Sequence, residues 1–416
     1  MNAQLPHVLV LQVGARLHYA VPAVYAQAGA LRRLYTDACA SVGVLSVARR
    51  MIPTRLRAPD LRRLLGRTLP PELAPELVEV ATWSTVHERI ERRFAGGHSS
   101  VLTTHERLRR RILAAGFEGA NCFYCVDNCD LNLMLAARDA GLALIYEQLI
   151  NPSVGRVLRD ERRLYPGIER EDPEELIEGG IARDIEVFRT ADAVICASEF
   201  VRDDVLSLAG PTAHPALVPY GVHAEWLEVP RAPVPGRILF VGTVGLRKGN
   251  HYLAEATRLL KARGVRCEVR VIGPYDPNVI ARPEFQGPTY VGQVPREVVR
   301  AEFALADVFT IPTIADGFAI VHLEAFACGL PVVTTPNCGS QVRHGEDGFV
   351  VPIRDARALA DRLQQLVEDR ELRDRMSRNA TQRARELNWS RFGQRLVTVT
   401  RDALRAATER NASKAS

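Results

Sequence analysis

The sequence predicts an α/β protein in which two doubly wound parallel-sheet domains face a central cleft. Two observations predict this architecture. Apolar, β-branched runs alternate with helical stretches along most of the chain, and a proline-rich segment divides the alternation into two halves. The length agrees, because 416 residues exceed what one hydrophobic core usually organises. In open parallel sheets, ligands bind beyond the carboxyl ends of the strands, so we expect the functional site in the cleft.

The first half contains repeated strand–helix units. An apolar strand at 7–13 is followed by a helical stretch at about 21–33. Further strands are expected at 122–126, 142–147, 191–198 and 216–221, separated by helices at 131–141, 154–190 and 199–209. Residues 1–225 are therefore predicted to form an N-terminal Rossmann-like domain.

The second half restarts the same pattern after a linker. Residues 227–236 read LEVPRAPVPG, a composition typical of a connecting segment. After it we expect strands at 237–242, 267–273, 288–294, 307–312 and 331–335, and helices at 250–263, 295–305 and 316–329. Residues 226–392 are predicted to be the second Rossmann-like domain. A bend at NWSRF, 388–392, would let a helix at about 393–416 pack back on the first domain.

Composition excludes several classes of protein. A net charge of +5 and a pI near 8.8 are too mild to indicate nucleic-acid binding. The chain contains no uncharged apolar run of ~18 residues, so we expect no transmembrane helix. We also expect no signal peptide. The eight cysteines are then expected to be reduced thiols of a cytoplasmic protein. Cys122, Cys125 and Cys129 lack the further ligands of a closed zinc site, so no metal site is predicted.

One stretch raises a specific question, because a largely apolar helix carries two acids. In DGFAIVHLEAFACGLPVV, residues 316–333, Glu324 lies near the middle of the helix and Asp316 before its first turn. A carboxylate in such surroundings is costly unless another group pairs with it. That partner is either another part of the protein or a ligand.

The same stretch offers a site for a nucleotide. If Asp316 or Gly317 caps the helix, the first free N–H groups, ready to meet an anion, belong to Phe318, Ala319 and Ile320. Glu324 then lies ~9 Å further along the axis, at ~1.5 Å per residue. This spacing roughly matches the distance from a diphosphate to its ribose, whose hydroxyls can donate to a carboxylate.

A second candidate is the loop VGTVGLRKGN at 241–250, which follows a strand and precedes a helix. It is not a P-loop, because Gly245 is followed by Leu-Arg-Lys. The turn after the first strand has one glycine and so lacks the dinucleotide fingerprint. Arg247 and Lys248 could neutralise a diphosphate. The alternative is a solvated basic pair.

Together these segments resemble the retaining glycosyltransferases of family 4, within glycosyl transferases group 1, which have the GT-B fold. The resemblance rests on a carboxylate, seven residues and a glutamate, followed by AFACGLPVVTT and GEDGFVV, with FVGTVGLRKGNHYLAEA, YVGQVPREVV and ALADVFTIPT upstream. It covers roughly 190–390. It implies transfer of a sugar from a UDP- or GDP-sugar to a glycan or lipid-linked acceptor, in cell-surface polysaccharide or glycolipid synthesis.

The resemblance also implies roles for individual residues. Lys248, with Arg247 nearby, would stabilise the departing diphosphate, and Glu324 would hold the ribose. Asp316 would contact the transferred sugar. The other implied donor contacts are Gly14 from the first domain, Gly242 and Thr243, Val294 against the base, and Gly317, Phe318, Ala319 and Ile320.

Two departures from the family pattern leave an alternative open. The first acid is usually Glu and here is Asp316, and the family often has Arg where Thr243 stands. A catalytically inactive nucleotide-sugar-binding or partner-binding GT-B protein is therefore the second hypothesis. No Asp-x-Asp triplet occurs in the chain, so we expect no required cofactor and no metal.

The first domain is expected to select the acceptor. Polar residues follow its strands at His18, Tyr19, Asp127, Asn128 and Glu147. They are acceptor-side candidates, although surface loops are commonly polar.

Two arginine-rich segments suggest a further contact. Residues 49–67 hold seven arginines against one aspartate, interleaved with apolar residues, and 107–113 repeats the theme. Such composition suits peripheral contact with an anionic membrane, here the inner face of the cytoplasmic membrane. A solvated helix face is the alternative.

Overall fold

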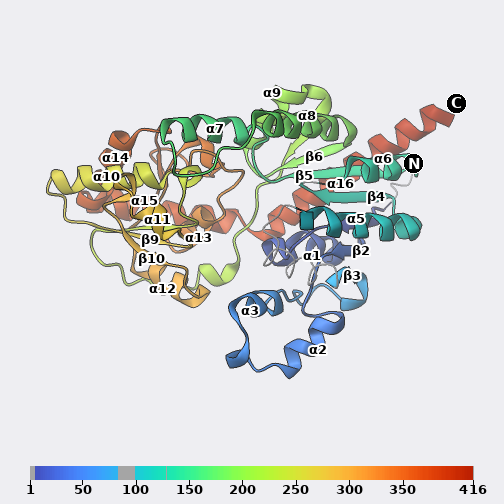
Figure 1. Cartoon of the computed structure of the whole chain (residues 1–416), viewed down its shortest axis with the longest axis horizontal. Helices are drawn as coiled ribbons and strands as arrows, with labels where there is room; N and C mark the ends of the chain where they lie inside the picture. The colour runs from blue at the N-terminus through green and yellow to red at the C-terminus, as the bar shows by residue number, and fades with distance from the viewer. Residues whose placement is uncertain (1–4, 83–98, 128, 416) are drawn as a thin grey trace.

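The computed structural model describes residues 5–82, 99–127 and 129–415. They form two α/β domains that lie side by side (Figure 1). The first domain is built on a seven-stranded sheet of order β3-β2-β1-β4-β5-β6-β7, and the second on a six-stranded sheet of order β10-β9-β8-β11-β12-β13. Every strand pairing in both sheets is parallel. The predicted pair of doubly wound sheets is confirmed.

The first sheet is covered on both faces. Its strands are β1 (Val8–Leu11), β2 (Leu31–Thr36), β3 (Val78–Val80), β4 (Cys122–Val126), β5 (Ala143–Gln148), β6 (Ala193–Cys196) and β7 (Pro215–Leu217). Along β1, Val8 and Val10 pack on the face of α1 (Ala20–Gln27), whereas Leu9 and Leu11 pack on the opposite face. That opposite face carries α5 (Ser99–Ala114), α6 (Leu131–Asp139), α8 (Glu174–Thr190) and α9 (Glu199–Ala209). Burial on both faces explains why the central strands are continuous apolar runs.

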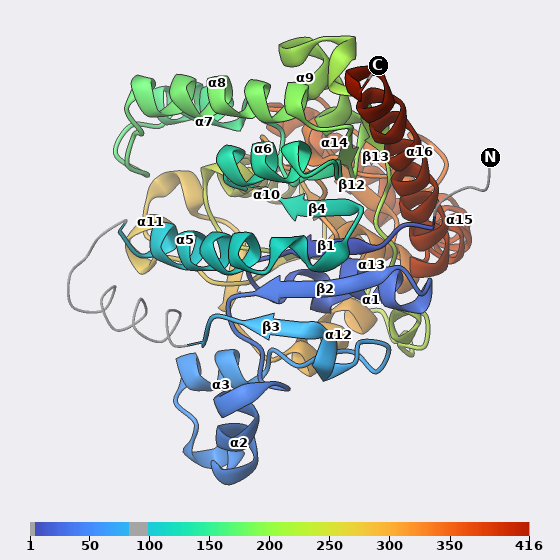
Figure 2. The same cartoon turned by 90° about the vertical axis from the view of Figure 1, so that its right-hand side faces the viewer.

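One predicted element of this domain is wrong in extent. The helix expected at 21–33 ends at Gln27. Gly29 then adopts a left-handed conformation with φ 65°, and the chain returns as the strand β2. Between β2 and β3, two short helices, α2 (Gly43–Met51) and α3 (Pro59–Leu65), extend away from the sheet (Figure 2).

The second domain follows the predicted order. Its strands are β8 (Arg237–Val241), β9 (Glu268–Ile272), β10 (Thr289–Gly292), β11 (Val308–Ile311), β12 (Val332–Thr334) and β13 (Gly348–Val350). Its helices are α10 (Asn250–Ala262), α11 (Pro277–Ile280), α12 (Arg296–Leu305), α13 (Val321–Ala327), α14 (Ala356–Glu368) and α15 (Arg370–Glu386).

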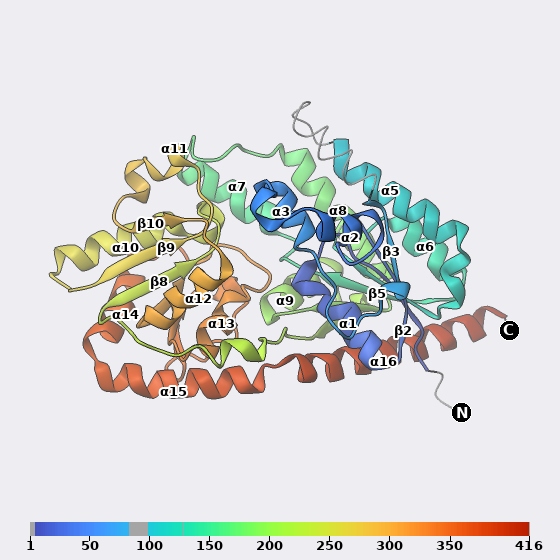
Figure 3. The same cartoon turned by 90° about the horizontal axis from the view of Figure 1, so that it is seen from below.

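The last helix, α16 (Trp389–Ala415), leaves the second domain and runs along the first (Figure 3). The Thr400 hydroxyl lies 2.8 Å from the Tyr25 hydroxyl of α1, and Arg410 donates to the Leu142 carbonyl at 3.2 Å. Several apolar side chains of α16 are buried in the same core as α1. The tail of the chain therefore helps to hold the two domains together.

A second connection between the domains passes through α7 (Val154–Leu164), which lies above the second domain in Figure 1. Its Glu161 is fully buried. The Glu161 carboxylate lies 2.7 Å from His251 Nε2 and accepts from Arg354 Nε at 2.6 Å, and both partners belong to the second domain. A buried carboxylate with two partners fixes α7 against that domain.

Candidate active site

The glycine-rich loop after β8 is positioned by two close backbone approaches. A Cβ at Gly273 would lie 2.0 Å from the Gly242 carbonyl oxygen, and a Cβ at Gly249 would lie 1.9 Å from that of Pro312. Both residues also have positive φ, so only glycine fits without strain. The Arg247 carbonyl accepts from Ile314 N at 2.9 Å. The loop therefore lies against the segment that follows β11.

Lys248 and Arg247 converge on Asp316 in this arrangement. Lys248 Nζ pairs with one Asp316 carboxylate oxygen, and Arg247 Nη1 lies 3.3 Å from the other. Burial acts to raise the pKa of the Asp316 carboxyl, but the two cations outweigh it, and the net pKa lies below the ordinary value. Two cations and one carboxylate leave an excess positive charge at the carboxyl end of the second sheet. This charge favours an anion.

The segment between Asp316 and α13 is a loop, so the predicted helix start is wrong. Asp316 N donates to the Asn337 carbonyl at 2.9 Å, and Ala319 N donates to the Cys338 carbonyl at 3.2 Å. These bonds tie the segment to the turn after β12 and delay the helix until Val321. The Ala319 N–H, expected to be open, is therefore occupied. The N–H groups of Phe318 and Ile320 make no hydrogen bond to a described residue.

Glu324 lies on α13 and is partly buried. Across residues 5–82, 99–127 and 129–415, its carboxylate makes no hydrogen bond or ion pair. Arg296 and Arg300 of α12 are close enough to act on it electrostatically, but both pair with Glu225 instead. Burial raises the pKa of Glu324 to about 7, although the two arginines act in the opposite direction. The carboxylate thus keeps its full capacity to accept hydrogen bonds from a ligand.

His322, two residues earlier, is structural. Its side chain is fully buried. Its Nδ1 donates to the Ala319 carbonyl at 2.5 Å, and its Nε2 accepts from Gln341 N at 3.1 Å, which together require the neutral ring. Burial lowers the pKa of His322 to about 4. The ring fastens the loop before α13 to the loop after β12.

The first domain contacts this site at Gly317 and Phe318. A Cβ on Gly317 would lie 1.6 Å from the Leu149 carbonyl oxygen, and the Ser198 hydroxyl donates to the Gly317 carbonyl at 2.6 Å. The Phe318 ring packs edge-on against Tyr220, with centroids 5.2 Å apart. Gly317 is thus required by close packing of the two domains.

The remaining predicted donor contacts are dispersed around the loops. Thr243 is exposed and Val294 is partly buried. Gly14, in the first domain, has φ 83° and donates its N–H to the Asp37 carboxylate at 2.8 Å. A Cβ on Gly14 would meet no atom within 4 Å, so this glycine borders open space.

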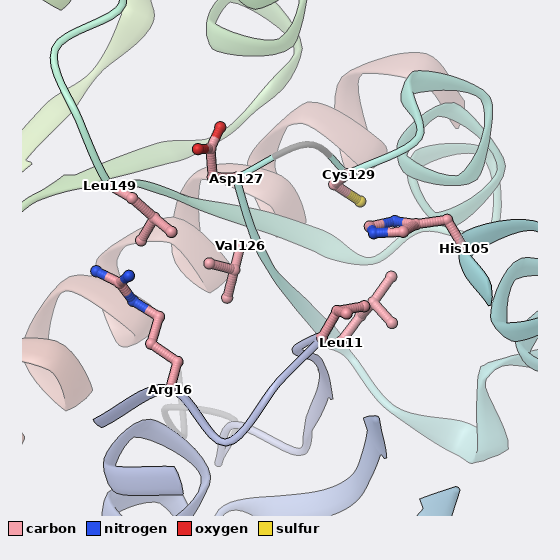
Figure 4. A pocket seen from close by; sticks show the side chains of 8 residues that line it. Leu11, Arg16, His105, Val126, Asp127, Cys129 and Leu149 are labelled. Carbon is pink, nitrogen blue, oxygen red and sulfur yellow. The ribbon is translucent and has the colours of Figure 1, made fainter. Parts of the chain in front are cut away.

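A cavity of about 160 Å³ lies at the carboxyl ends of β1, β4 and β5 in the first domain (Figure 4). Its lining combines polar and apolar side chains: Leu11, Val13, Arg16, His105, Val126, Asp127, Cys129 and Leu149. Of the acceptor-side candidates, Asp127 is part of this lining. Its carboxylate accepts from the Tyr146 hydroxyl at 3.3 Å. His105 was not predicted, because it comes from α5 and not from a strand end.

Two acceptor-side candidates are turned into the core, which the sequence could not show. The buried Tyr19 hydroxyl donates to the Ala38 carbonyl at 3.1 Å. The buried Glu147 carboxylate accepts from the Tyr124 hydroxyl at 2.7 Å and also from Tyr220. Neither side chain can contact an acceptor in this arrangement. Asn128 lies outside the described residues.

His18 instead reaches the second domain. Its Nε2 accepts from Arg296 Nη1 at 2.9 Å. Leu17, His18 and Tyr19 all have positive φ, between 49° and 60°, a conformation that costs about 1–3 kcal/mol per non-glycine residue. The strained turn holds His18 between the domains, beside the helix that borders Glu324.

No metal cluster accompanies these groups. Within the residues the structure describes, no three His, Cys, Asp or Glu side chains gather as a metal site would require. All eight cysteines are free thiols.

Residues 229–383 match the family described as glycosyl transferases group 1. Over 203 residues the chain is 30% identical to the putative colanic acid biosynthesis glycosyltransferase WcaL of Salmonella typhimurium, a match that covers 43% of this chain and 48% of that protein. Over 186 residues it is 31% identical to the D-inositol 3-phosphate glycosyltransferase of Pseudarthrobacter chlorophenolicus, covering 42% and 43%. The chain thus matches about half the length of these curated relatives.

The architecture extends the likeness to the whole chain. The crystal structure of Anabaena HepE in complex with UDP and glucose superposes with a TM-score of 0.61 at 14% identity, covering 94% of this chain and 98% of that one. At this identity the likeness concerns the fold. Residues 229–383 thus match the glycosyl transferases group 1 family, and the chain as a whole has the GT-B fold.

Proposed function

We propose that this chain is a retaining glycosyltransferase that moves a sugar from a UDP- or GDP-sugar to a glycan or lipid-linked acceptor, in cell-surface polysaccharide or glycolipid synthesis. The observation that carries the proposal is the Glu324 carboxylate, which is partly buried and has no partner among the described residues. A ribose supplies two hydroxyl donors that would satisfy it. The cations that suit the attached diphosphate, Lys248 and Arg247, lie at the same end of the sheet.

The charges of the site suit cleavage of a sugar–phosphate bond. As the bond from the sugar C1 to the phosphate oxygen breaks, negative charge builds on the departing diphosphate, and the Lys248 and Arg247 cations stabilise it. When the diphosphate takes Lys248, Asp316 is released and accepts from the sugar hydroxyls. The acceptor oxygen bonds to C1 on the face the diphosphate leaves, and its proton passes to a phosphate oxygen. This scheme uses no covalent nucleophile and no metal.

The cavity beside Asp127 is the natural place for the acceptor. It lies at the carboxyl edge of the first sheet, and Leu149 on its lining belongs to the segment that meets Gly317 of the second domain. The two relatives have different names, a putative colanic acid biosynthesis glycosyltransferase and a D-inositol 3-phosphate glycosyltransferase, and so do not indicate one shared acceptor. The acceptor of this chain therefore has to be found by experiment.

A donor screen followed by a turnover assay tests the proposal. Thermal-shift measurements with UDP, GDP and ADP identify the base, and the matching nucleotide sugars are then assayed for release of nucleoside diphosphate. Lys248→Ala is expected to lower the rate at least about a hundredfold, by the usual worth of one charge-stabilising donor. The control Lys261→Ala removes an exposed lysine of α10 and should leave the rate unchanged. Tight donor binding without transfer or hydrolysis would overturn the proposal and favour the inactive binding protein.

A further inference from the structure

The two short helices α2 and α3 form a projection below the first sheet, beyond its edge strand β3 (Figures 1 and 2). The projection has a small core of its own. Leu45 of α2 packs with Leu64 and Leu65 of α3, and these side chains are buried. The inner faces of the two helices are therefore satisfied, and their outer faces are free to meet something else.

The outer face of α2 is apolar. Val44, Val47 and Met51 are all exposed and, at ~100° per residue, lie within an arc of ~60°. Leu56 follows in the connection to α3. Met51 and Leu56 are 75% and 70% exposed, the two highest values for large apolar side chains in the described part of the chain. We call these four residues the apolar outer stripe.

Unpaired arginines surround the apolar outer stripe. The side chains of Arg49, Arg50, Arg55, Arg62 and Arg63 are exposed. None of them forms an ion pair with a described residue, in contrast to Arg67, which binds Asp37 at 2.6 Å. Exposed apolar side chains beside exposed cations are disfavoured in water but match the boundary between lipid headgroups and acyl chains.

From these observations we propose that the α2–α3 projection docks on an anionic lipid bilayer, with the apolar outer stripe inserted and the arginines among the headgroups. A bilayer accepts a convex element, whereas a protein partner would need a groove shaped for it. The excess of arginine over acidic residues in 49–67 selects an anionic surface. This inference is independent of the proposed transfer activity. It gives a lipid-linked acceptor a route to the enzyme if that activity holds.

The other arginine-rich segment does not take part. On α5, Arg109 and Arg110 pair with Glu106, and Arg111 pairs with Glu79, all at 2.7 Å. Leu108 and Ile112, which flank these arginines, are buried in the core. Three arginines of residues 107–113 are thus paired with acids, so this segment is left out of the proposal.

Vesicle sedimentation with the full chain tests the proposal. Wild-type protein is expected to bind vesicles of equal parts phosphatidylglycerol and phosphatidylcholine at low salt, and not vesicles of phosphatidylcholine alone. The charge variant, Arg49→Gln with Arg50→Gln and Arg55→Gln, should bind about a hundredfold more weakly, at about fivefold per arginine. The stripe variant, Val47→Ser with Met51→Ser, should lose about thirtyfold.

Matched controls remove the same groups elsewhere. Arg375→Gln with Arg378→Gln and Arg395→Gln takes three exposed arginines from α15 and α16, and Leu176→Ser alters a side chain that is 69% exposed on α8. These variants should bind as the wild type does. Because all the substituted side chains are exposed, thermal unfolding of every variant should be unchanged.

Insertion has a direct readout. Tryptophan fluorescence of Met51→Trp should shift to the blue on vesicle binding and be quenched by brominated acyl chains. Failure of the wild type to bind anionic vesicles, equal losses in the control variants, or an unshifted Met51→Trp spectrum would each overturn the proposal. So would wild-type affinity of the stripe variant, arginine-dependent binding of duplex DNA that matches the vesicle affinity, or self-association that the stripe variant abolishes.

Discussion

Glu324→Gln is expected to raise the stability of this protein at pH 8 and, at the same time, to weaken the proposed donor binding. Burial raises the pKa of the Glu324 carboxyl from its ordinary 4.5 to about 7. Between these pH values the folded chain holds a proton that the unfolded chain releases, so the contribution to stability is complete below pH 4.5 and is lost as the pH rises to 7. At ~1.4 kcal/mol per pH unit the loss approaches ~3 kcal/mol, and partial exposure reduces it to ~2 kcal/mol. Glutamine carries no such cost, and the variant should be more stable than the wild type at pH 8.

The same substitution should weaken donor binding. Ribose hydroxyls donate to the ionised carboxylate, so wild-type affinity for a nucleotide sugar should be constant above pH 7 and fall about tenfold per pH unit below it. The diphosphate of a nucleotide sugar is fully ionised throughout this range and adds no titration of its own. Replacing hydrogen bonds to a charged acceptor by bonds to a neutral amide should cost about tenfold to a hundredfold in affinity at pH 8. The variant's affinity should no longer depend on pH.

Two measurements on the same samples check both effects. Urea unfolding at pH 5 and pH 8 gives the free energies of unfolding, and isothermal titration calorimetry across pH 5.5–8.5 gives donor affinity. Glu297→Gln, an exposed acid on α12 without a partner among the described residues, is the control and should change neither quantity. Equal stabilities of wild type and Glu324→Gln at pH 8, or an unchanged donor affinity in the folded variant, would refute the account of this carboxylate.

Four other outcomes are expected. Because the buried His322 is neutral with a pKa near 4, its own contribution to the free energy of unfolding should fall by up to ~3 kcal/mol between pH 6.5 and pH 4, opposite in sign to that of Glu324, and urea titrations of wild type and His322→Gln should differ by this slope. Glu161→Leu, which leaves two basic partners unpaired, should cost ~3 kcal/mol in the same assay. Gly317→Ala, whose Cβ would lie 1.6 Å from the Leu149 carbonyl oxygen, should lower turnover more than ~10-fold by separating the domains, whereas Gly179→Ala, with open space around it, should not. Addition of EDTA should leave the release of nucleoside diphosphate unchanged; a rate restored only by Mg²⁺ would contradict the metal-independent scheme.

The central strands could be predicted from the sequence because burial on both faces leaves a simple signal. Every residue of β4, CFYCV, and of β5, ALIYEQ, is buried. The strand β2, which lies next to the edge strand β3, gives no such signal, since it reads LRRLYT and its first half is exposed or partly buried. After the turn at Gly29, β2 pairs with β1. The local sequence pattern had instead predicted that the preceding helix continues to residue 33. Tertiary pairing therefore overrode the local sequence pattern at β2.

The parts of the candidate site that could be predicted are those whose signal lies within one short segment of the sequence. Lys248 lies in a loop between β8 and α10, and Glu324 is a lone acid in an apolar helix, so both were visible locally. The start of α13 was not, because the bonds that delay it come from Asn337 and Cys338. A position at a strand end also does not say which way a side chain points, and Glu147 points into the core, toward Tyr124 and Tyr220.

The pairing of Lys248 with Asp316 compensates a nearly buried charge. Lys248 is only 13% exposed, so without Asp316 its charge would lie nearly buried and unpaired. The carboxylate therefore stabilises the lysine, and under the proposed function a donor diphosphate would displace Asp316 from it. In the proposed reaction, this displacement would free the Asp316 carboxylate to accept hydrogen bonds at the place where the transferred sugar would lie. The aspartate that departs from the family pattern is thus compatible with turnover, since its short side chain reaches Lys248 while Gly317, the next residue, is held against the first domain.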